Sequence, residues 1–223
     1  MRILAIDAAM ARCSAALVVD GVVAARREAA AGRGQAAALP PMVQAVLTEA
    51  GSAATALDGV AVTVGPGSFT GLRAAIALAQ GVALSAGVSV VGVTVAEALA
   101  ERVGESLRGR ALWVAIDSRR GRVFLQTGAS LAPVELDALP PANGGVAIAG
   151  DAAIAVAARL AARGDDVMLT DARVPDAVDV AAVGARRLRG EIAPCPAQPL
   201  YVDPPEAKLP AGGLRPPPEP PLA

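Results

Sequence analysis

Residues 60–86 read VAVTVGPGSFTGLRAAIALAQGVALSA, an apolar strand followed by a glycine-rich turn and a long helix. The glycines of the turn permit positive φ angles, and a hydroxyl side chain behind them can cap the first turn of the helix. A strand, a glycine turn and a helix N-terminus in this order also favour the binding of anions. We expect the structural motif to comprise Gly65, Gly67, Ser68, Thr70 and Gly71.

The turn does not match the common nucleotide-binding patterns. A P-loop requires a lysine and then Ser or Thr after its last glycine, and this chain has Leu72 and Arg73 there. The dinucleotide fingerprint places its third glycine three positions after the second, whereas Gly71 follows Gly67 by four positions. We therefore predict a backbone turn that starts the helix, with phosphate binding as the alternative.

The composition excludes several classes of catalytic site. The 223 residues include no histidine, which removes Ser-His-Asp and Cys-His catalysis and every imidazole metal site. The net charge of −1 gives no general attraction to nucleic acid or to an anionic membrane. Aromatic residues make up only 2%, so the core must consist of Ala, Val and Leu. We predict no catalytic residue, no cofactor and no metal ion in this chain.

The cysteines and the apolar segments point to a cytoplasmic protein. Cys13 and Cys195 are far apart and have no zinc-binding spacing, so free thiols are expected. The sequence opens directly on a strand, and we expect no secretory signal. Residues 74–100 are the most apolar stretch, but polar residues and glycine interrupt them, so we expect no membrane span.

Apolar periodicity divides the chain into two lobes and a tail. Residues 1–105 show the order β-β-β-α-β-α-β, with strands expected at 3–6, 13–19, 22–28, 60–64 and 88–93 and helices at 39–50, 71–86 and 95–103. Residues 106–192 repeat the opening of this pattern in a smaller lobe, with strands at 111–116, 123–127, 145–149 and 167–170 and helices at 152–162 and 179–188. Residues 193–223 are rich in proline and form the tail.

Two aspartates end the first strands of the two lobes. Asp7 follows the strand at 3–6, and Asp117 follows the strand at 111–116. A duplicated hairpin that leads into α-β-α-β is the layout of the actin-like (ASKHA, ribonuclease-H-like) α/β fold, whose active members carry an acidic residue at these places. Strand-end punctuation is the alternative for each aspartate. Ala8 and Met10 offer no hydroxyl or glycine beside Asp7, which argues against catalysis at the first hairpin.

The two helices of the first lobe are unusually apolar. The helix at 71–86 is apolar nearly all round, and the helix at 39–50 carries a strong apolar stripe with few charges. A helix that is apolar on every side must be covered on every side. Either the chain's own sheet and neighbours cover these helices, or a partner protein does.

Six segments resemble successive landmarks of the bacterial TsaB family. They read ILAIDAAMARCSAALVVDG, GRGQAAALPPMVQAVLTEAG, VAVTVGPGSFTGLRAAIALAQGVAL, VVGVTVAEALA, VAIDSRRGRVF and PLYVDPPEAKLP. GPGSFTGLR is highly specific to that family. Independent support comes from the terminal Tyr201 with Pro205-Glu206-Ala207-Lys208 and from Asp117, Arg119, Gly121, Val123 and Phe124.

The resemblance implies a two-lobed actin-like fold and a role in making threonylcarbamoyladenosine beside the anticodon of tRNA. It implies a non-catalytic subunit that pairs with the paralogue TsaD, which transfers the threonylcarbamoyl group, and works with the ATPase TsaE, while tRNA is met through the complex. The chain departs from the family at Ala8 and Met10, where Thr is frequent. It also has Gln35 and Ala37 where a His and a nearby Glu are frequent.

In this family the two helices of the first lobe pair with TsaD, which sets the expected contact residues. They are Leu39, Met42, Val43, Val46, Leu72, Ile76 and Gln80, with Arg73 in an ion pair across the interface. Without its partner, the same apolar face could support a homodimer. The alternatives are an active actin-like ATPase or kinase and a metalloprotease, and the absence of histidine argues against the second.

Overall fold

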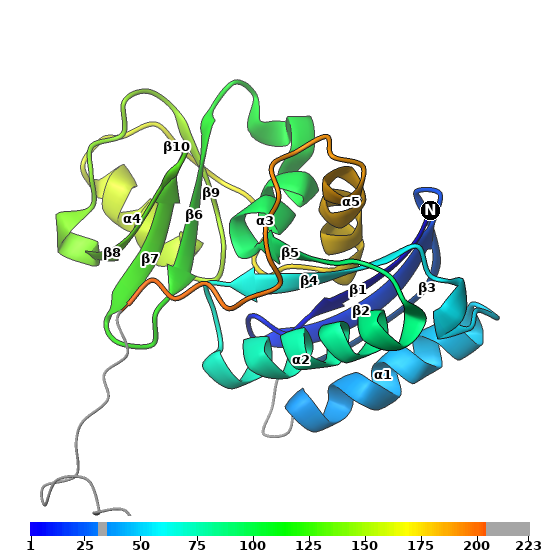
Figure 1. Ribbon diagram of the computed structural model, residues 1–223. Coiled ribbons are helices and arrows are strands. Elements are labelled where there is room, and N and C mark those ends of the chain that lie inside the picture. The colour runs from blue at the N-terminus through cyan, green and yellow to red at the C-terminus, as the bar shows by residue number, and fades with distance from the viewer. Residues whose placement is uncertain (31–34, 204–223) are drawn as a thin grey trace, which may run out of the picture.

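The computed structural model describes residues 1–30 and 35–203, which form two α/β lobes side by side (Figure 1). The first lobe contains β1 (Arg2–Asp7), β2 (Arg12–Val19), β3 (Val22–Ala30), α1 (Gln35–Glu49), η1 (Ala54–Ala56), β4 (Gly59–Gly65), α2 (Phe69–Ala86), β5 (Val90–Thr94), α3 (Val95–Val103) and η2 (Gly104–Leu107). The remaining elements are β6 (Ala111–Asp117), β7 (Arg122–Thr127), β8 (Ser130–Glu135), η3 (Leu136–Ala138), β9 (Val146–Ala149), α4 (Ala153–Ala162), β10 (Val167–Leu169) and α5 (Ala177–Leu188).

The two sheets share one topology, which confirms the predicted internal repeat. The strand orders are β3-β2-β1-β4-β5 and β8-β7-β6-β9-β10. In each sheet the central strand, β1 or β6, pairs antiparallel with the following hairpin strand and parallel with the fourth strand of its lobe. The α/β actin-like class expected from the sequence has this two-lobed layout.

Local signals account for the element boundaries. The β2–β3 hairpin turns at Asp20 and Gly21, both with positive φ, as a tight two-residue turn requires. Ser68 is the N-cap of α2, and its hydroxyl accepts a hydrogen bond from the Gly71 amide at 3.2 Å. Thr94 and Glu97 form a capping box at the start of α3.

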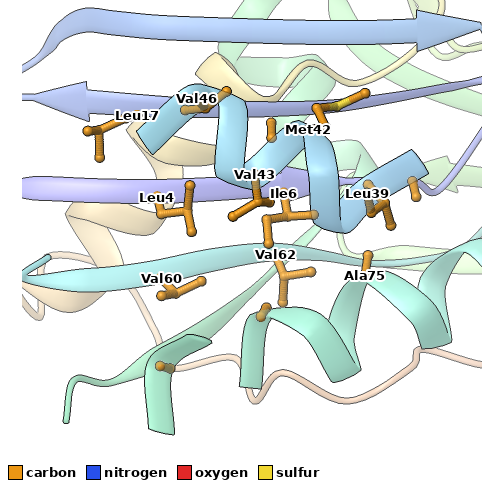
Figure 2. Close-up of a cluster of buried hydrophobic side chains, with 14 of the residues drawn as sticks. Leu4, Ile6, Leu17, Leu39, Met42, Val43, Val46, Val60, Val62 and Ala75 are labelled. Atoms are coloured by element: carbon orange, nitrogen blue, oxygen red, sulfur yellow. The ribbon is translucent and has the colours of Figure 1, made fainter. Parts of the chain in front are cut away.

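The largest core cluster lies between the first sheet and the pair α1 and α2. Figure 2 shows side chains from both helices, such as Val43 and Ala75, directed at Ile6 and Val62 of the central strands. Both helices meet the sheet through small and branched side chains, because the chain has few aromatic residues to fill the space. The opposite face of this sheet is covered by α5.

The position of α5 corrects the predicted domain boundary. Its residues fall within 106–192, which we assigned to the smaller lobe, yet Val180 and Val183 pack against Ile3 and Ala61 of the first sheet. Gly184 allows this close approach, since a Cβ atom there would lie 2.4 Å from the Cβ of Ala61. The chain therefore returns to the first lobe after building the second.

Residues 193–203 follow α5 without a helix or strand, as expected for the tail, but they are closely packed. We call this segment the strap. The Gly92 amide donates to the Cys195 carbonyl at 2.8 Å, and the Leu200 amide donates to the Val64 carbonyl at 2.8 Å. In Figure 1 the orange strap runs from α5 across the first lobe towards β7. The rest of the predicted tail, 204–223, lies outside the described residues.

Strand β8 differs from the sequence prediction, and helix α2 bears on the expectation that the chain has no membrane span. The strand β8 (Ser130–Glu135) was not predicted, because Pro133 interrupts its sequence, and it is the edge strand of the second sheet, where proline is tolerated. Among the described residues, α2 alone is long and apolar enough to meet the length and composition of a membrane span. Helices in the core of a folded domain meet the same test, and α2 packs on β4 through Leu72, Ala75 and Ile76.

Candidate functional site

The carboxyl ends of four strands meet at a cleft of about 990 Å³ between the lobes. The turn after β1 and the glycine-rich turn after β4 form one wall, and the turn after β6 with Asp151 after β9 forms the other. The strap closes the cleft along a third side through Leu200 to Asp203. Strand ends at a change of connection are where α/β folds bind ligands, so this cleft is the first candidate site.

The wall formed by the first lobe is sealed by close backbone packing. The Ser68 amide donates to the Ala9 carbonyl at 2.7 Å. A Cβ atom at Gly67 would lie 2.1 Å from that carbonyl oxygen, and one at Gly71 would lie 2.2 Å from the carbonyl oxygen of Ala8. The turn after β1 therefore presents carbonyl oxygens to the glycine-rich turn, which leaves no space for a phosphate group between them.

Asp7 lies behind this wall and does not line the cleft. Its Oδ1 accepts hydrogen bonds from the Thr63 hydroxyl and, at 3.1 Å, from the Ala9 amide. Its Oδ2 is buried and has no hydrogen-bond partner among the described residues. Burial raises the pKa of Asp7 to about 6 although both hydrogen bonds lower it. Asp7 is thus a buried structural carboxyl in this arrangement.

Asp117, its counterpart in the second lobe, faces the cleft. The Asp117 amide donates to Oδ1 of Asp151 at 2.8 Å, and the Asp117 carboxylate accepts from the Arg119 amide at 2.8 Å. The Arg119 guanidinium lies 3.6 Å from Asp117 and 3.7 Å from Asp151. Burial raises the pKa of Asp151. The two carboxylates are already bound by backbone amides and an arginine, and no cluster of three metal-ligating side chains occurs among the residues described.

The structure corrects most of the contact residues that we predicted for a partner. Six of them are buried in the chain's own core, with exposed fractions of 9% or less, because the apolar stripes of α1 and α2 face the first sheet and the core cluster that joins the two lobes: Leu39, Met42, Val43, Val46, Leu72 and Ile76. Arg73 and Gln80 are exposed on α2. Gln80 also donates to the Ala197 carbonyl at 3.0 Å, so it helps to hold the strap.

A different face of α2 is largely exposed. Phe69 and Leu84 are 58% and 85% exposed, and Ala77 and Gly81 are exposed between them on the same side of the helix. Residues spaced by three or four lie along one face of a helix. We call this set, with Arg73, the outer face of α2. It lies beside the exposed surface of α1, because the two helices pack side by side (Figure 1).

Sequence reasoning missed several residues that the fold brings to the cleft. Asp151 follows β9 as Gly67 follows β4, so the repeat itself carries the signal that could have located it. Tyr201 was noted only as a landmark, and Asp203 only as part of a quoted segment. No local signal places them at the cleft, because their position depends on the path of the strap.

The residues of the predicted glycine-rich motif have different roles in the structure. Gly65 has a φ of +117°, Gly67 is required for close packing, and Thr70 is exposed.

Comparison with known proteins assigns the family. The profile of TsaD, tRNA N6-adenosine threonylcarbamoyltransferase, matches residues 28–173. The Escherichia coli tRNA threonylcarbamoyladenosine biosynthesis protein TsaB is 41% identical over 124 residues, which are 56% of this chain and 53% of that protein. The chain belongs to the TsaD family, in its TsaB branch. It spans about half the length of the curated TsaB relatives it matches.

Two further relatives extend the family assignment. A tRNA N6-adenosine threonylcarbamoyltransferase of Maricaulis maris is 43% identical over 79 residues, 34% of this chain and 21% of that protein. A solved Pseudomonas aeruginosa structure, described as similar to the peptidase YeaZ, has a TM-score of 0.75 and 29% identity and covers 91% of this chain and 99% of its own. The resemblance implied by the sequence, a TsaB protein with an actin-like fold, is confirmed.

Proposed function

We propose that this chain acts in the cytoplasm as a non-catalytic scaffold in the synthesis of threonylcarbamoyladenosine in tRNA, and that it binds the catalytic paralogue TsaD. The ATPase TsaE and tRNA join through the resulting complex. The outer face of α2 supports the proposal most directly. Leu84 and Phe69 are exposed apolar side chains on a helix whose opposite side is already packed, and such patches mark protein interaction sites.

The sealed wall of the cleft supports a role without catalysis. The Ala8 and Ala9 carbonyls of the turn after β1 pack against the glycine-rich turn, and Asp7 is buried behind them, so the first hairpin presents neither a carboxylate nor a hydroxyl to the cleft. A partner of the same family would carry a matching helix pair. Two such pairs would form a four-helix contact, and stable interfaces of this kind bury about 1,600 Å² in total.

The test uses this chain and the TsaD protein from the same genome. Leu84→Asp places a charge on the outer face of α2, where a partner would have to desolvate it, so we expect complex formation on a sizing column to be lost. Ile154→Asp is the matched control, since Ile154 is 63% exposed on the second lobe. Both variants should retain the melting temperature of the wild type. Turnover of a substrate by the isolated chain, or failure of the wild type to bind TsaD, would contradict the proposal.

An ATPase or kinase remains the second candidate because the cleft is large and pairs Asp117 and Asp151 with Arg119. Titration calorimetry with MgATP separates the two candidates. Micromolar binding that is lost in Asp117→Asn would favour the enzyme, and absence of heat would favour the scaffold. The peptidase description of the solved relative is hard to reconcile with this chain, which has no histidine for a zinc site.

A further inference from the structure

Three side chains from two distant parts of the chain meet at one rim of the cleft. The Arg73 guanidinium lies 3.8 Å from the centre of the Phe69 ring, and its Nε donates to the Tyr201 hydroxyl at 3.0 Å. The Phe69 and Tyr201 rings are 6.1 Å apart. Tyr201 belongs to the strap and the other two belong to α2, so the cluster joins the tail of the chain to the outer face of α2.

This cluster is exposed although it is ordered by its own contacts. Phe69 is 58% exposed and Tyr201 is 52% exposed. Among the described residues no carboxylate pairs with Arg73, although most other arginines of the chain have one. Exposed aromatic rings held rigidly around an arginine are the composition that dominates binding energy in protein interfaces. A partner that covers Arg73 must therefore supply an acidic group opposite its guanidinium.

We propose that the strap is part of the partner-binding surface and that Tyr201, Arg73 and Phe69 form its energetic centre. This inference rests on the proposed function and names the occupant as the same-family transferase, TsaD. The occupant presents an apolar helix face with an acidic side chain opposite Arg73. Because the cluster also lines the cleft, the docked partner covers one rim of the cleft.

The strap is held firmly enough to serve this role. The Gln80 amide donates to Ala197, the Leu200 amide donates to Val64, and Arg122 of the second lobe pairs with Asp203 at 3.2 Å. These contacts fix Tyr201 from both sides along the chain. A side chain that is already ordered loses little entropy on binding, which favours affinity.

The affinity of TsaD for single-site variants tests the inference by titration calorimetry. We expect Tyr201→Ala and Arg73→Ala each to weaken binding at least about tenfold, as for a central interface residue. Tyr201→Phe keeps the ring and loses only the bond to Arg73, so its effect should be smaller. Leu169→Ala is the control, because Leu169 is an exposed apolar residue of β10 in the second lobe.

A second measurement covers the case in which Tyr201→Ala loosens the strap. Hydrogen exchange in the wild type should show added protection of the amides at 198–203 when TsaD is bound. Unchanged protection, or wild-type affinity of Tyr201→Ala while Leu84→Asp still abolishes binding, overturns this inference and leaves the proposed function intact. Absence of binding by the wild type overturns both. A self-dimer that Tyr201→Ala dissociates would make a second copy the occupant and would overturn the choice of TsaD.

Discussion

The carbonyl oxygen of Ala9 lies 2.1 Å from the point that a Cβ atom would occupy at Gly67. The two residues belong to turns that follow β1 and β4, and the neighbouring Ser68 amide donates to the same oxygen. The glycine-rich motif therefore packs backbone on backbone. This contact brings the N-terminus of α2 against the first hairpin and leaves no space between the two turns.

Gly67→Ala is expected to lower the free energy of unfolding by about 2 to 3 kcal/mol, because the backbone must move apart to admit a methyl group. Gly81→Ala is the matched control. Nothing lies within 4 Å of a Cβ atom at Gly81, which is exposed in α2 beyond that turn, so alanine should stabilise the protein by up to about 1 kcal/mol. Urea unfolding of both variants measures the difference, and equal effects would refute the packing argument.

The buried carboxyl of Asp7 should make stability depend on pH. Its pKa in the folded protein is about 6, raised from 3.8, so the folded state holds the proton more tightly than the unfolded state. The free energy of unfolding should therefore fall as pH rises from about 4 to about 6, by about 3 kcal/mol at 1.36 kcal/mol per pKa unit. Asp7→Asn cannot ionise, and its unfolding curves should lack this fall. A wild-type slope retained in Asp7→Asn would assign the effect to another group.

Removing the Asp176 carboxylate should cost much more folding stability than removing an exposed carboxylate. It is buried at the N-cap of α5, and the guanidinium groups of Arg12, Arg26 and Arg102 lie around it, the first at 3.4 Å and the last at 3.3 Å. Burial alone would raise its pKa, but the hydrogen bonds from Arg26 and the Val178 amide hold the pKa below its usual value.

Asp176→Asn should lower the free energy of unfolding by about 3 to 5 kcal/mol at pH 7, since it leaves partly buried cations without their counter-charge. The lowered pKa means that the stabilisation by this carboxylate is lost only as pH falls below about 4. Glu191→Gln, which removes an exposed ion pair with Arg189, should leave the free energy of unfolding nearly unchanged, because water screens the pair. Thermal and urea unfolding of the two variants would reveal whether the network around Asp176 matters to the docking of α5.

The stability of the protein should respond very differently to an aspartate at two neighbouring positions of α2. Ile76 is 5% exposed in the core, and Ile76→Asp should cost at least about 4 kcal/mol or prevent folding. Ala77 is exposed on the outer face, so Ala77→Asp should leave the melting temperature nearly unchanged and should weaken binding of TsaD. A folded, cooperative Ile76→Asp protein would show that α2 is less tightly packed than its contacts indicate.

The predicted strands and helices were largely found, because alternating and helical apolar periods reflect local geometry. The repeat of a strand into Asp7 and a strand into Asp117 correctly indicated two related lobes. Local periodicity could not assign α5 to a lobe, since its apolar stripe would suit either sheet. Gly184 fits closely over Ala61, and this contact between residues distant in sequence places α5 on the first sheet.

The six apolar contact residues predicted on α1 and α2 were wrong for a physical reason. Both helices are apolar on most sides, so the strongest stripe, which includes Val46 and Ile76, was assigned to a partner. In the fold that stripe covers β1 and β4, and the weaker side of α2 with Phe69 and Leu84 stays exposed. The side with the most branched residues makes the best core, because it buries more apolar area against the sheet.

The sequence by itself determined the order of the elements, the cap at Ser68, the absence of histidine chemistry and the family to which the chain belongs. Those properties reside in residue types and short spacings. Tertiary structure alone decided which helix faces are free, why Gly67 must be glycine, and that Tyr201 reaches Arg73 across 128 positions of the chain. Each of these depends on segments that are distant in sequence and are brought together only when both lobes and the strap have packed.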